Sequence, residues 1–326
     1  MSEKTVYFTD FDVVRNRATF DADAEISLEN FERLTGAYHF TQEVICQVRT
    51  PGGVCHQKHK RGCLGVMKDG REALIGNRCA DHYFKSDLKF SLERKRVKDE
   101  IERQRIFSQY HTILAEQETE REALSLLHWQ ALQTSAMIKS WYKGFQPGVL
   151  RFIYNAGKTG NGNVVIETEH VTTEIRVIEG EEQEKRISKW LPEVLGRLSP
   201  LPEERVVQDM VDGAGKAKDA LDTLIVCDPE ALSFRKLKTL VTAIDSADLI
   251  SQQQNDIKAD VERFKQRTNL QLLFFVQDRW DDSDRVLAQI LRMRGNKYTP
   301  ADIRREEKRI LATFASQIKE RAWRAV

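Results

Sequence analysis

The feature that most restricts the fold of this chain is a run of 67 residues, Asn77 to Lys143, that contains neither glycine nor proline. The run is rich in Glu, Lys, Arg, Leu and Gln, which are all good helix formers. The segment EQETERE (116–122) interrupts its apolar pattern. We therefore expect a long charged helix here, as either one helix or two.

The second half of this run carries apolar residues at the spacing of a heptad repeat. Steps of three and four connect Leu124, Leu127, Ala131, Thr134, Ile138 and Trp141. Tyr110 and Ile113 lie in the same frame. Such a seam fits a coiled coil, in which residues 110–141 pair with a protein partner or with a second copy. It fits equally a long helix that packs on its own domain.

Four of the five cysteines fall within 34 residues, with two histidines between them and a third three residues after the last cysteine. The cluster consists of Cys46, Cys55, Cys63, Cys79, His56, His59 and His82. The first residues show no apolar run behind a basic region, so we expect no secretory signal and a cytoplasmic location. Because the cytosol keeps thiols reduced, clustered Cys and His indicate zinc rather than disulfides.

The spacing of this cluster suggests how four ligands converge. Cys46 and Cys55 flank a Pro-Gly-Gly turn, and Cys79 and His82 share one side of a helical turn. The candidate ligands are therefore Cys46, Cys55, Cys79 and His82, with His59 and Cys63 as alternates. Loop ligands, a hairpin and a Cys/His pair on a helix start resemble a treble-clef-type zinc finger over residues 46–82. The sequence departs from that family in its first pair, which is stretched to Cys46-x8-Cys55.

The cluster favours a structural zinc over a catalytic one. A catalytic zinc keeps one coordination position open and needs a general base nearby. The sequence has no H-E-x-x-H or H-x-E…P-C-x-x-C pattern, and it offers more than four candidate ligands. We therefore expect a closed site in a protein that is not an enzyme.

The charge of the chain is balanced overall but not locally. The formal net charge of +1 excludes a uniformly basic nucleic-acid coat. Residues 1–45 have a net charge of −5, whereas residues 56–106 and 292–326 each have +6. Candidate phosphate contacts are Lys58, Lys60, Arg61, Arg71, Arg78, Lys85 and Lys89. The alternative is that these charges only form a solvated helix face.

The remaining segments predict an α+β fold that is mostly helical. We expect a strand at 6–14, a short helix at 27–34 and a hairpin at 63–76. A second hairpin is expected from strands at 149–156 and 163–180, with mainly helices after 181. Thr299 is the expected N-cap of the last helix, with Pro300 first and Asp302 third in it.

Four segments follow from these patterns: an acidic N-terminal segment (1–37), a zinc-binding module (38–84), a long helix or coiled coil (85–147), and a hairpin with a helical domain (148–326). No apolar run approaches the ~20 residues that a membrane helix needs. The functional hypothesis is a zinc-containing, non-enzymatic protein that binds nucleic-acid phosphates. The alternative is a coiled-coil scaffold with a purely structural zinc.

Overall fold

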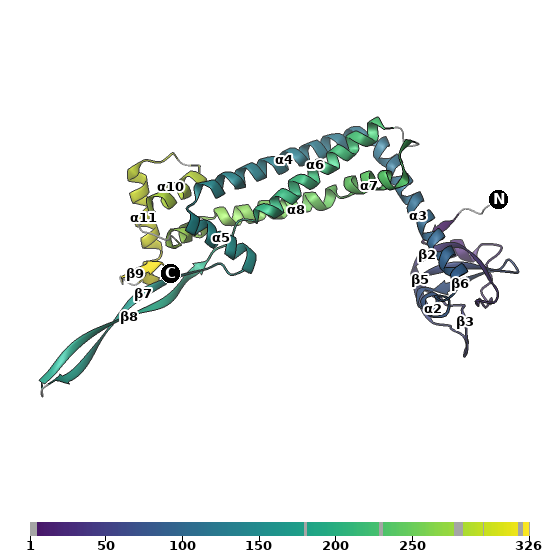
Figure 1. Cartoon of the computed structure of the whole chain (residues 1–326), viewed down its shortest axis with the longest axis horizontal. Coiled ribbons are helices and arrows are strands. Elements are labelled where there is room, and N and C mark those ends of the chain that lie inside the picture. The colour runs from purple at the N-terminus through teal and green to yellow at the C-terminus, as the bar shows by residue number, and fades with distance from the viewer. Residues whose placement is uncertain are drawn as a thin grey trace. The chain divides into compact units, whose positions relative to one another are not determined.

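The computed structural model (Figure 1) describes residues 5–178, 181–227, 231–276, 283–295, 297–318 and 322–325. The chain is α+β and mostly helical, which confirms the predicted fold class. It divides into two compact units. The first unit runs to Glu116 and includes Leu232–Lys238, and the second comprises Gln117–Ala231 and the chain from Thr239 onward.

The first unit is built on a four-stranded sheet in the order β1-β2-β5-β6. Its strands are β1 (Val6–Phe8), β2 (Phe31–Ile45), β5 (Lys58–Met67) and β6 (Glu72–Gly76). β1 runs parallel to β2, and β5 runs antiparallel to both β2 and β6. The predicted hairpin at 63–76 is confirmed as β5 and β6. Gly70 closes its turn with a φ of +87°, which a residue with a side chain rarely adopts.

The N-terminal predictions were wrong in two places. The strand expected at 6–14 ends at Phe8, and a short helix α1 (Phe11–Arg15) follows, with Asp10 as its N-cap. The helix expected at 27–34 does not form, because β2 begins at Phe31. The Asn30 side chain accepts a hydrogen bond from the Ser27 backbone N–H, which stabilises a turn instead.

The predicted boundary between residues 37 and 38 falls inside β2. The acidic segment therefore contributes strands to the same sheet as the cysteine region and does not form a separate part. A buried carboxylate fixes this connection, since Glu72 at the start of β6 accepts hydrogen bonds from Arg17, Thr19 and Thr35. Burial raises the pKa of Glu72, but these hydrogen bonds together lower it below the ordinary value.

The run without glycine or proline forms three helices: α2 (Asn77–Tyr83), α3 (Leu88–Ala115) and α4 (Gln117–Gly144). Of the two alternatives left open, the one with a break near 116 is observed, since α3 ends with Glu116 as its C-cap. The break before α3 was not predicted. Asp87 makes it by capping α3, because its carboxylate accepts the Phe90 backbone N–H at 2.6 Å.

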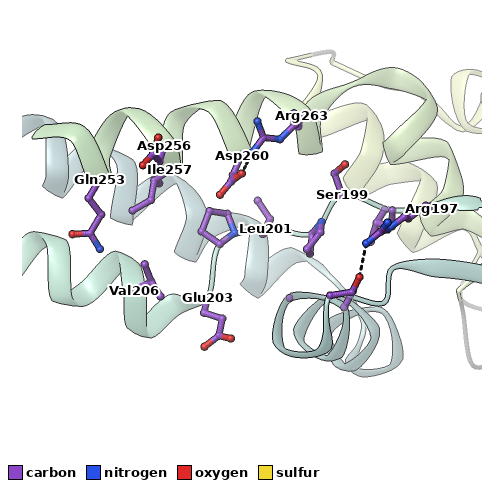
Figure 2. Close-up of a pocket in the computed structure, with 16 residues that line it drawn as sticks. Arg197, Ser199, Leu201, Glu203, Val206, Gln253, Asp256, Ile257, Asp260 and Arg263 are labelled. Carbon is purple, nitrogen blue, oxygen red and sulfur yellow. Dashed lines mark hydrogen bonds and ion pairs between the residues drawn. The ribbon is translucent and has the colours of Figure 1, made fainter. Parts of the chain in front are cut away.

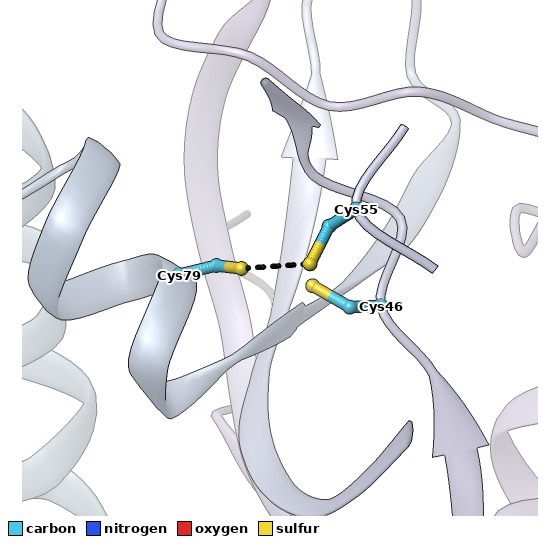
Figure 3. A group of neighbouring side chains, drawn as sticks. All are labelled: Cys46, Cys55 and Cys79. Atoms are coloured by element: carbon cyan, nitrogen blue, oxygen red, sulfur yellow. Dashed lines mark hydrogen bonds between the residues drawn. The ribbon is translucent and has the colours of Figure 1, made fainter. Parts of the chain in front are cut away.

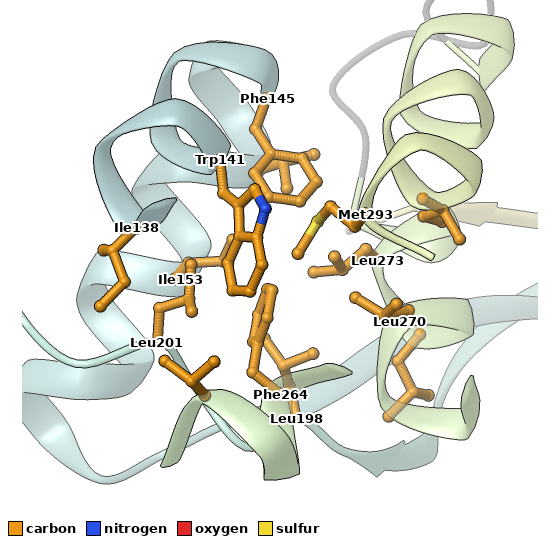
Figure 4. Close-up of a cluster of buried hydrophobic side chains, with 14 of the residues drawn as sticks. Ile138, Trp141, Phe145, Ile153, Leu198, Leu201, Phe264, Leu270, Leu273 and Met293 are labelled. Atoms are coloured by element: carbon orange, nitrogen blue, oxygen red, sulfur yellow. The ribbon is translucent and has the colours of Figure 1, made fainter. Parts of the chain in front are cut away.

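The second unit is a helical body with a β-ribbon. Its helices are α4, α5 (Pro147–Thr159), α6 (Glu204–Val226), α8 (Ala247–Lys265), α9 (Arg267–Leu272), η2 (Leu273–Phe275), α10 (Ser283–Met293), α11 (Pro300–Thr313) and α12 (Ala315–Ile318). A further helix, α7, spans Phe234–Asp245. The core, shown in Figure 4, gathers Trp141 and Phe264, whose rings stack at 6.4 Å. The predicted Thr299 cap of α11 is confirmed as a capping box with Asp302.

The predicted heptad seam lies inside this unit. α4 packs against α6, and Leu124, Ala131 and Ile138 are buried within the chain. The seam is thus the face of a helix packed on its own domain. Tyr110 and Ile113, the first residues of the predicted frame, lie in α3 of the first unit.

Two other predictions for this unit were wrong. Residues 149–156 lie in helix α5, since Val149, Ile153 and Ala156 repeat at helical spacing and are buried together. The hairpin pairs β7 (Asn163–Ile178) with β8 (Glu181–Arg197), a segment predicted to be helical. Its Glu- and Lys-rich composition favours a helix locally, but pairing with β7 overrides that preference. Residues 179 and 180, part of the expected strand, lie outside the described residues.

β8 is an edge strand, since the sheet order is β8-β7-β9, with β9 at Trp323–Ala325. This position accommodates Pro192, which lacks a backbone N–H to donate. In the described residues, no helix is both long and apolar enough to span a membrane.

Candidate metal centre

Three structural elements bring three cysteines together. Cys46 directly follows β2, Cys55 directly follows β4 (Gly53–Val54), and Cys79 lies in the first turn of α2. Between the first two, β3 (Arg49–Thr50) pairs with β4 around the Pro-Gly-Gly turn, where Gly53 has a φ of +110°. The short hairpin folds the chain back, so that Cys46 and Cys55 return to the same place.

Backbone hydrogen bonds hold this loop in register. The Cys55 N–H donates to the Val48 carbonyl at 2.9 Å, and the His56 N–H donates to the Cys46 carbonyl at 3.2 Å. On the other side, β6 ends at Gly76 and α2 begins at Asn77, which places Cys79 against the loop. The convergence therefore follows from hairpin and strand-to-helix geometry.

The three thiols form the candidate site (Figure 3). Their Sγ atoms all lie within 4.8 Å of one another, and the Cys79 thiol donates to the Cys55 sulfur at 3.3 Å. Tetrahedral zinc with Zn–S bonds of about 2.3 Å requires S–S distances of about 3.8 Å. Cys46, Cys55 and Cys79 could therefore hold a metal ion with only small side-chain adjustments.

The electrostatics of the site suit a cation. Burial raises the pKa of Cys46, while the backbone N–H groups of Gly76 and Val48 act in the opposite direction by favouring the thiolate. Burial and the neighbouring sulfur atoms raise the pKa of Cys79. Three crowded, partly buried thiols resist ionising together, and a metal cation would remove that repulsion. Thiolates are the ligands preferred by zinc and by other soft ions.

The structure does not bring the fourth predicted ligand, His82, into this group. His82 is exposed on α2, and its ring lies edge-on against Tyr83. A spacing of three residues rotates a side chain by roughly 60° about the helix axis. Because Cys79 faces the buried side of this short helix, that rotation carries His82 towards solvent.

Neither alternate, His59 or Cys63, belongs to the group of ligand atoms within 4.8 Å, and the two differ in their surroundings. Cys63 is buried in β5, and burial raises its pKa to about 11. His59 lines the same hollow as Cys46 and Cys79, whereas Cys63 lines a different one. The His59 ring lies against Gly76 and shares a 2.6 Å hydrogen bond with the Tyr38 hydroxyl. Burial lowers the pKa of His59, which favours the neutral ring that a metal requires.

A hollow of 460 Å³ opens beside the cysteines, between the end of β5 that is not paired with β6 and the start of α2. Its basic residues are His39, Lys58, His59, Lys60, Arg61 and Arg78. A second hollow of 630 Å³ shares His39, Arg61 and Asn77 with it, and adds Arg94, Lys98 and Arg105 from α3. The two hollows are lined by seven Lys/Arg and by a single carboxylate, Glu102, and one of the seven cations, Arg94, is paired with Asp81 at 2.5 Å.

The predicted phosphate contacts separate into two groups. Lys58, Lys60, Arg61 and Arg78 all line the first hollow, and none of them forms an ion pair within the described part of the chain. Arg71 lies in the β5–β6 turn, paired with Asp69 and Asp21, and Lys89 is paired with Glu32. Lys85 is exposed between α2 and α3 and lines neither hollow.

The contribution of α3 to this surface was not singled out by the sequence. Arg94, Lys98 and Arg105 lie four and seven residues apart, which places them on one helix face. That spacing was a usable signal, but α3 also carries cations on its other faces. Arg96, for example, is bound to Glu93 and to the Leu34 carbonyl.

A hollow of 790 Å³ in the second unit lies between the end of α5, residues 197–203 and α8 (Figure 2). Its charged groups are partly satisfied within the chain, since Arg263 pairs with Asp260 and Arg197 donates to the Gly160 carbonyl. It contains neither cysteine nor histidine. We assign it no chemistry.

No protein-family model, curated protein or solved structure matches this chain. The functional assignment therefore depends on the geometry of the cysteine cluster and of the basic surface beside it.

Proposed function

We propose that this chain is a non-enzymatic, zinc-containing protein that binds nucleic-acid phosphates through the basic surface beside its cysteine cluster. The cluster would be a variant of the treble-clef-type zinc finger. In this variant the β3–β4 loop supplies the first two ligands and α2 supplies the third.

The proposed zinc has a structural role. Held by Cys46, Cys55 and Cys79, it would join the end of β2, the β3–β4 loop and the start of α2. His59 is the proposed fourth ligand, because it borders the same hollow as two of the cysteines. It would exchange its hydrogen bond with Tyr38 for the metal. These links would hold both walls of the first hollow at a fixed separation.

The observation that carries the proposal is the set of cations around that hollow. Lys58, Lys60, Arg61 and Arg78 are exposed, and each lacks a carboxylate partner among the described residues. The lone carboxylate of the adjoining hollow, Glu102, is neutralised by Lys238 at 2.6 Å. Cations that are not neutralised internally attract the phosphates of a nucleic acid and release its counterions.

This surface would favour phosphates over bases. Long Lys and Arg side chains on a strand edge and a helix face contact the backbone of a nucleic acid without reading its sequence. We therefore expect binding with strong salt dependence and little sequence preference.

The test is a salt titration of binding to a labelled duplex, measured by fluorescence anisotropy for the zinc-loaded protein. Replacing Lys58, Lys60 and Arg61 together by Gln should weaken binding by ~10- to 100-fold and lower the slope of log K against log[salt] by ~2 to 3. The matched control replaces Arg71 and Lys89, which are paired elsewhere, and should leave the slope unchanged.

Single-stranded DNA and RNA of the same sequence, used as further probes, would identify the preferred nucleic acid. An unchanged slope in the triple variant would reject the surface as the binding site. Absence of binding by zinc-loaded wild-type protein at low salt would reject the proposed function altogether.

A further inference from the structure

Helix α4 contains a long uncharged stretch in a chain that is otherwise rich in charge. No Asp, Glu, Lys or Arg occurs from Ala123 to Ile138, although such residues make up 31% of the sequence. The buried seam against α6 accounts for only one side of this stretch. The opposite side is equally free of charge, and packing within the chain does not explain it.

The outer stripe of α4 consists of Leu126, Trp129, Leu132 and Ala136. Leu126 is 54% exposed, Trp129 is 58% exposed and Leu132 is 45% exposed. The steps of three and four place these side chains along one line of the helix. Single exposed apolar residues are ordinary, but an aligned set around a tryptophan marks an interaction surface.

Charged residues of opposite sign flank the two ends of this stripe. Glu118 and Glu122 continue the line towards the start of α4, and Lys139 and Lys143 continue it towards the end. Lys139 donates to the Gln208 side chain at 2.9 Å, and Glu118, Glu122 and Lys143 form no ion pair in the described part of the chain. This face of α4 is thus acidic before the stripe, apolar along it and basic after it.

We propose that this stripe pairs with the same stripe of a second copy of the chain, in antiparallel orientation. One alignment gives every residue of the stripe, and each flanking charge, a complementary residue on the second copy. It places Trp129 opposite Leu132 of the second copy, and Leu126 opposite Ala136. The same alignment places Glu122 opposite Lys139 and Glu118 opposite Lys143, and two-fold symmetry repeats each contact.

Charge complementarity selects this partner and this direction. A parallel pairing would place Glu118 beside Glu118 and Lys143 beside Lys143, and such like-charge contacts are unfavourable. Together with the charged residues that flank it, the stripe spans 26 residues (118–143), which corresponds to ~39 Å of helix. The antiparallel pair would bury both exposed tryptophans, and aromatic side chains are enriched at the centres of such interfaces.

The first experiment measures the mass of full-length protein by sedimentation equilibrium over a series of concentrations. We expect a reversible dimer of twice 37.7 kDa. Trp129→Glu should remain a monomer at concentrations where the wild type is dimeric. The matched control is Leu249→Glu, which changes an exposed leucine of α8 outside the stripe and should leave the dimer intact.

The second experiment tests the orientation. The variant E118K/E122K should dimerise at least tenfold more weakly, because its Lys residues face Lys139 and Lys143 of the second copy. The variant K139E/K143E should be weakened in the same way. Mixed in equal amounts, the two variants should form a heterodimer as tight as the wild-type dimer, since every charge then faces its opposite.

Each outcome bears on the proposal separately from nucleic-acid binding, which uses other residues. A wild-type chain that stays monomeric at all concentrations would overturn it. So would a dimer that persists in Trp129→Glu with unchanged affinity. If the two charge variants did not associate with each other, the antiparallel arrangement would be rejected. Circular dichroism of each variant tests whether the variant is still folded, so that loss of the dimer is not mistaken for unfolding.

Discussion

At the scale of single residues, the candidate metal site depends on which cysteine side chains lie close together. Three sulfur atoms within 4.8 Å of one another come from a strand end, a loop and a helix start. This arrangement adds a further link between segments that backbone hydrogen bonds and an apolar core already hold together. A metal ion bound to the native state alone would stabilise the first unit in proportion to its affinity.

Replacing a ligand should therefore remove the metal. We expect Cys46→Ser, Cys55→Ser and Cys79→Ser each to reduce zinc from near one per chain to near zero, because two thiolates hold zinc far more weakly than three. The measurement is elemental analysis after dialysis. His59→Ala should lower the affinity while leaving some metal bound.

Two matched controls make this prediction specific to the structure. Cys63→Ser and His82→Ala should keep their zinc, since Cys63 lines a different hollow and His82 is directed to solvent. Loss of zinc from His82→Ala would show that the spacing argument identified the fourth ligand correctly and that α2 changes its orientation when the metal binds.

At the scale of elements, α4 has two apolar faces that differ in burial. The inner face contributes Ile138 and Trp141 to the core of the second unit, whereas the outer stripe remains exposed. The heptad spacing described the inner face correctly as an apolar seam. It did not reveal that α6, more than 60 residues further along the chain, covers this seam.

A core truncation should measure how much the buried inner face of α4 contributes to stability. Ile138 is fully buried, so Ile138→Ala should lower the free energy of unfolding of the second unit by ~2–4 kcal/mol through lost apolar contact and the cavity left behind. Urea denaturation measures the change. The comparison variant Leu249→Ala, at an exposed position, should change stability by less than ~0.5 kcal/mol. Equal effects of the two variants would contradict the assignment of the inner face.

At the scale of the whole molecule, the chain consists of two units with separate apolar cores. The cluster around Phe31, Phe84 and Phe90 belongs to the first unit, and the cluster around Trp141 and Phe264 belongs to the second. The proposed metal contacts only the first. Its removal should therefore affect the two units unequally.

Chelation provides the test. Differential scanning calorimetry of the zinc-loaded protein should show two transitions, and a strong chelator should lower the temperature of one of them while leaving the other in place. The metal-free variant Cys55→Ser should reproduce the effect without a chelator and serves as the control. A single transition that shifts as a whole would show that the units unfold together.

Several features of this protein follow from local sequence alone. The helix-forming composition of 88–144, the β5–β6 hairpin and the Thr299 cap depend on residues close in sequence, and each was predicted. The cysteine-rich segment was identified for the same reason, because its four cysteines lie within 34 residues. Short-range preferences decide such features before any distant contact forms.

Other features depended on partners far along the chain. Residues 31–34 and 181–197 form strands because β5 and β7 pair with them, although their own composition favours helix. The direction in which α2 presents Cys79 and His82 was likewise set by packing, as was the choice between the two faces of α4. Local sequence proposed the candidate ligands and the apolar seam. Tertiary contacts decided which ligands meet and what covers the seam, because pairing and burial outweigh propensities of a few tenths of a kcal/mol per residue.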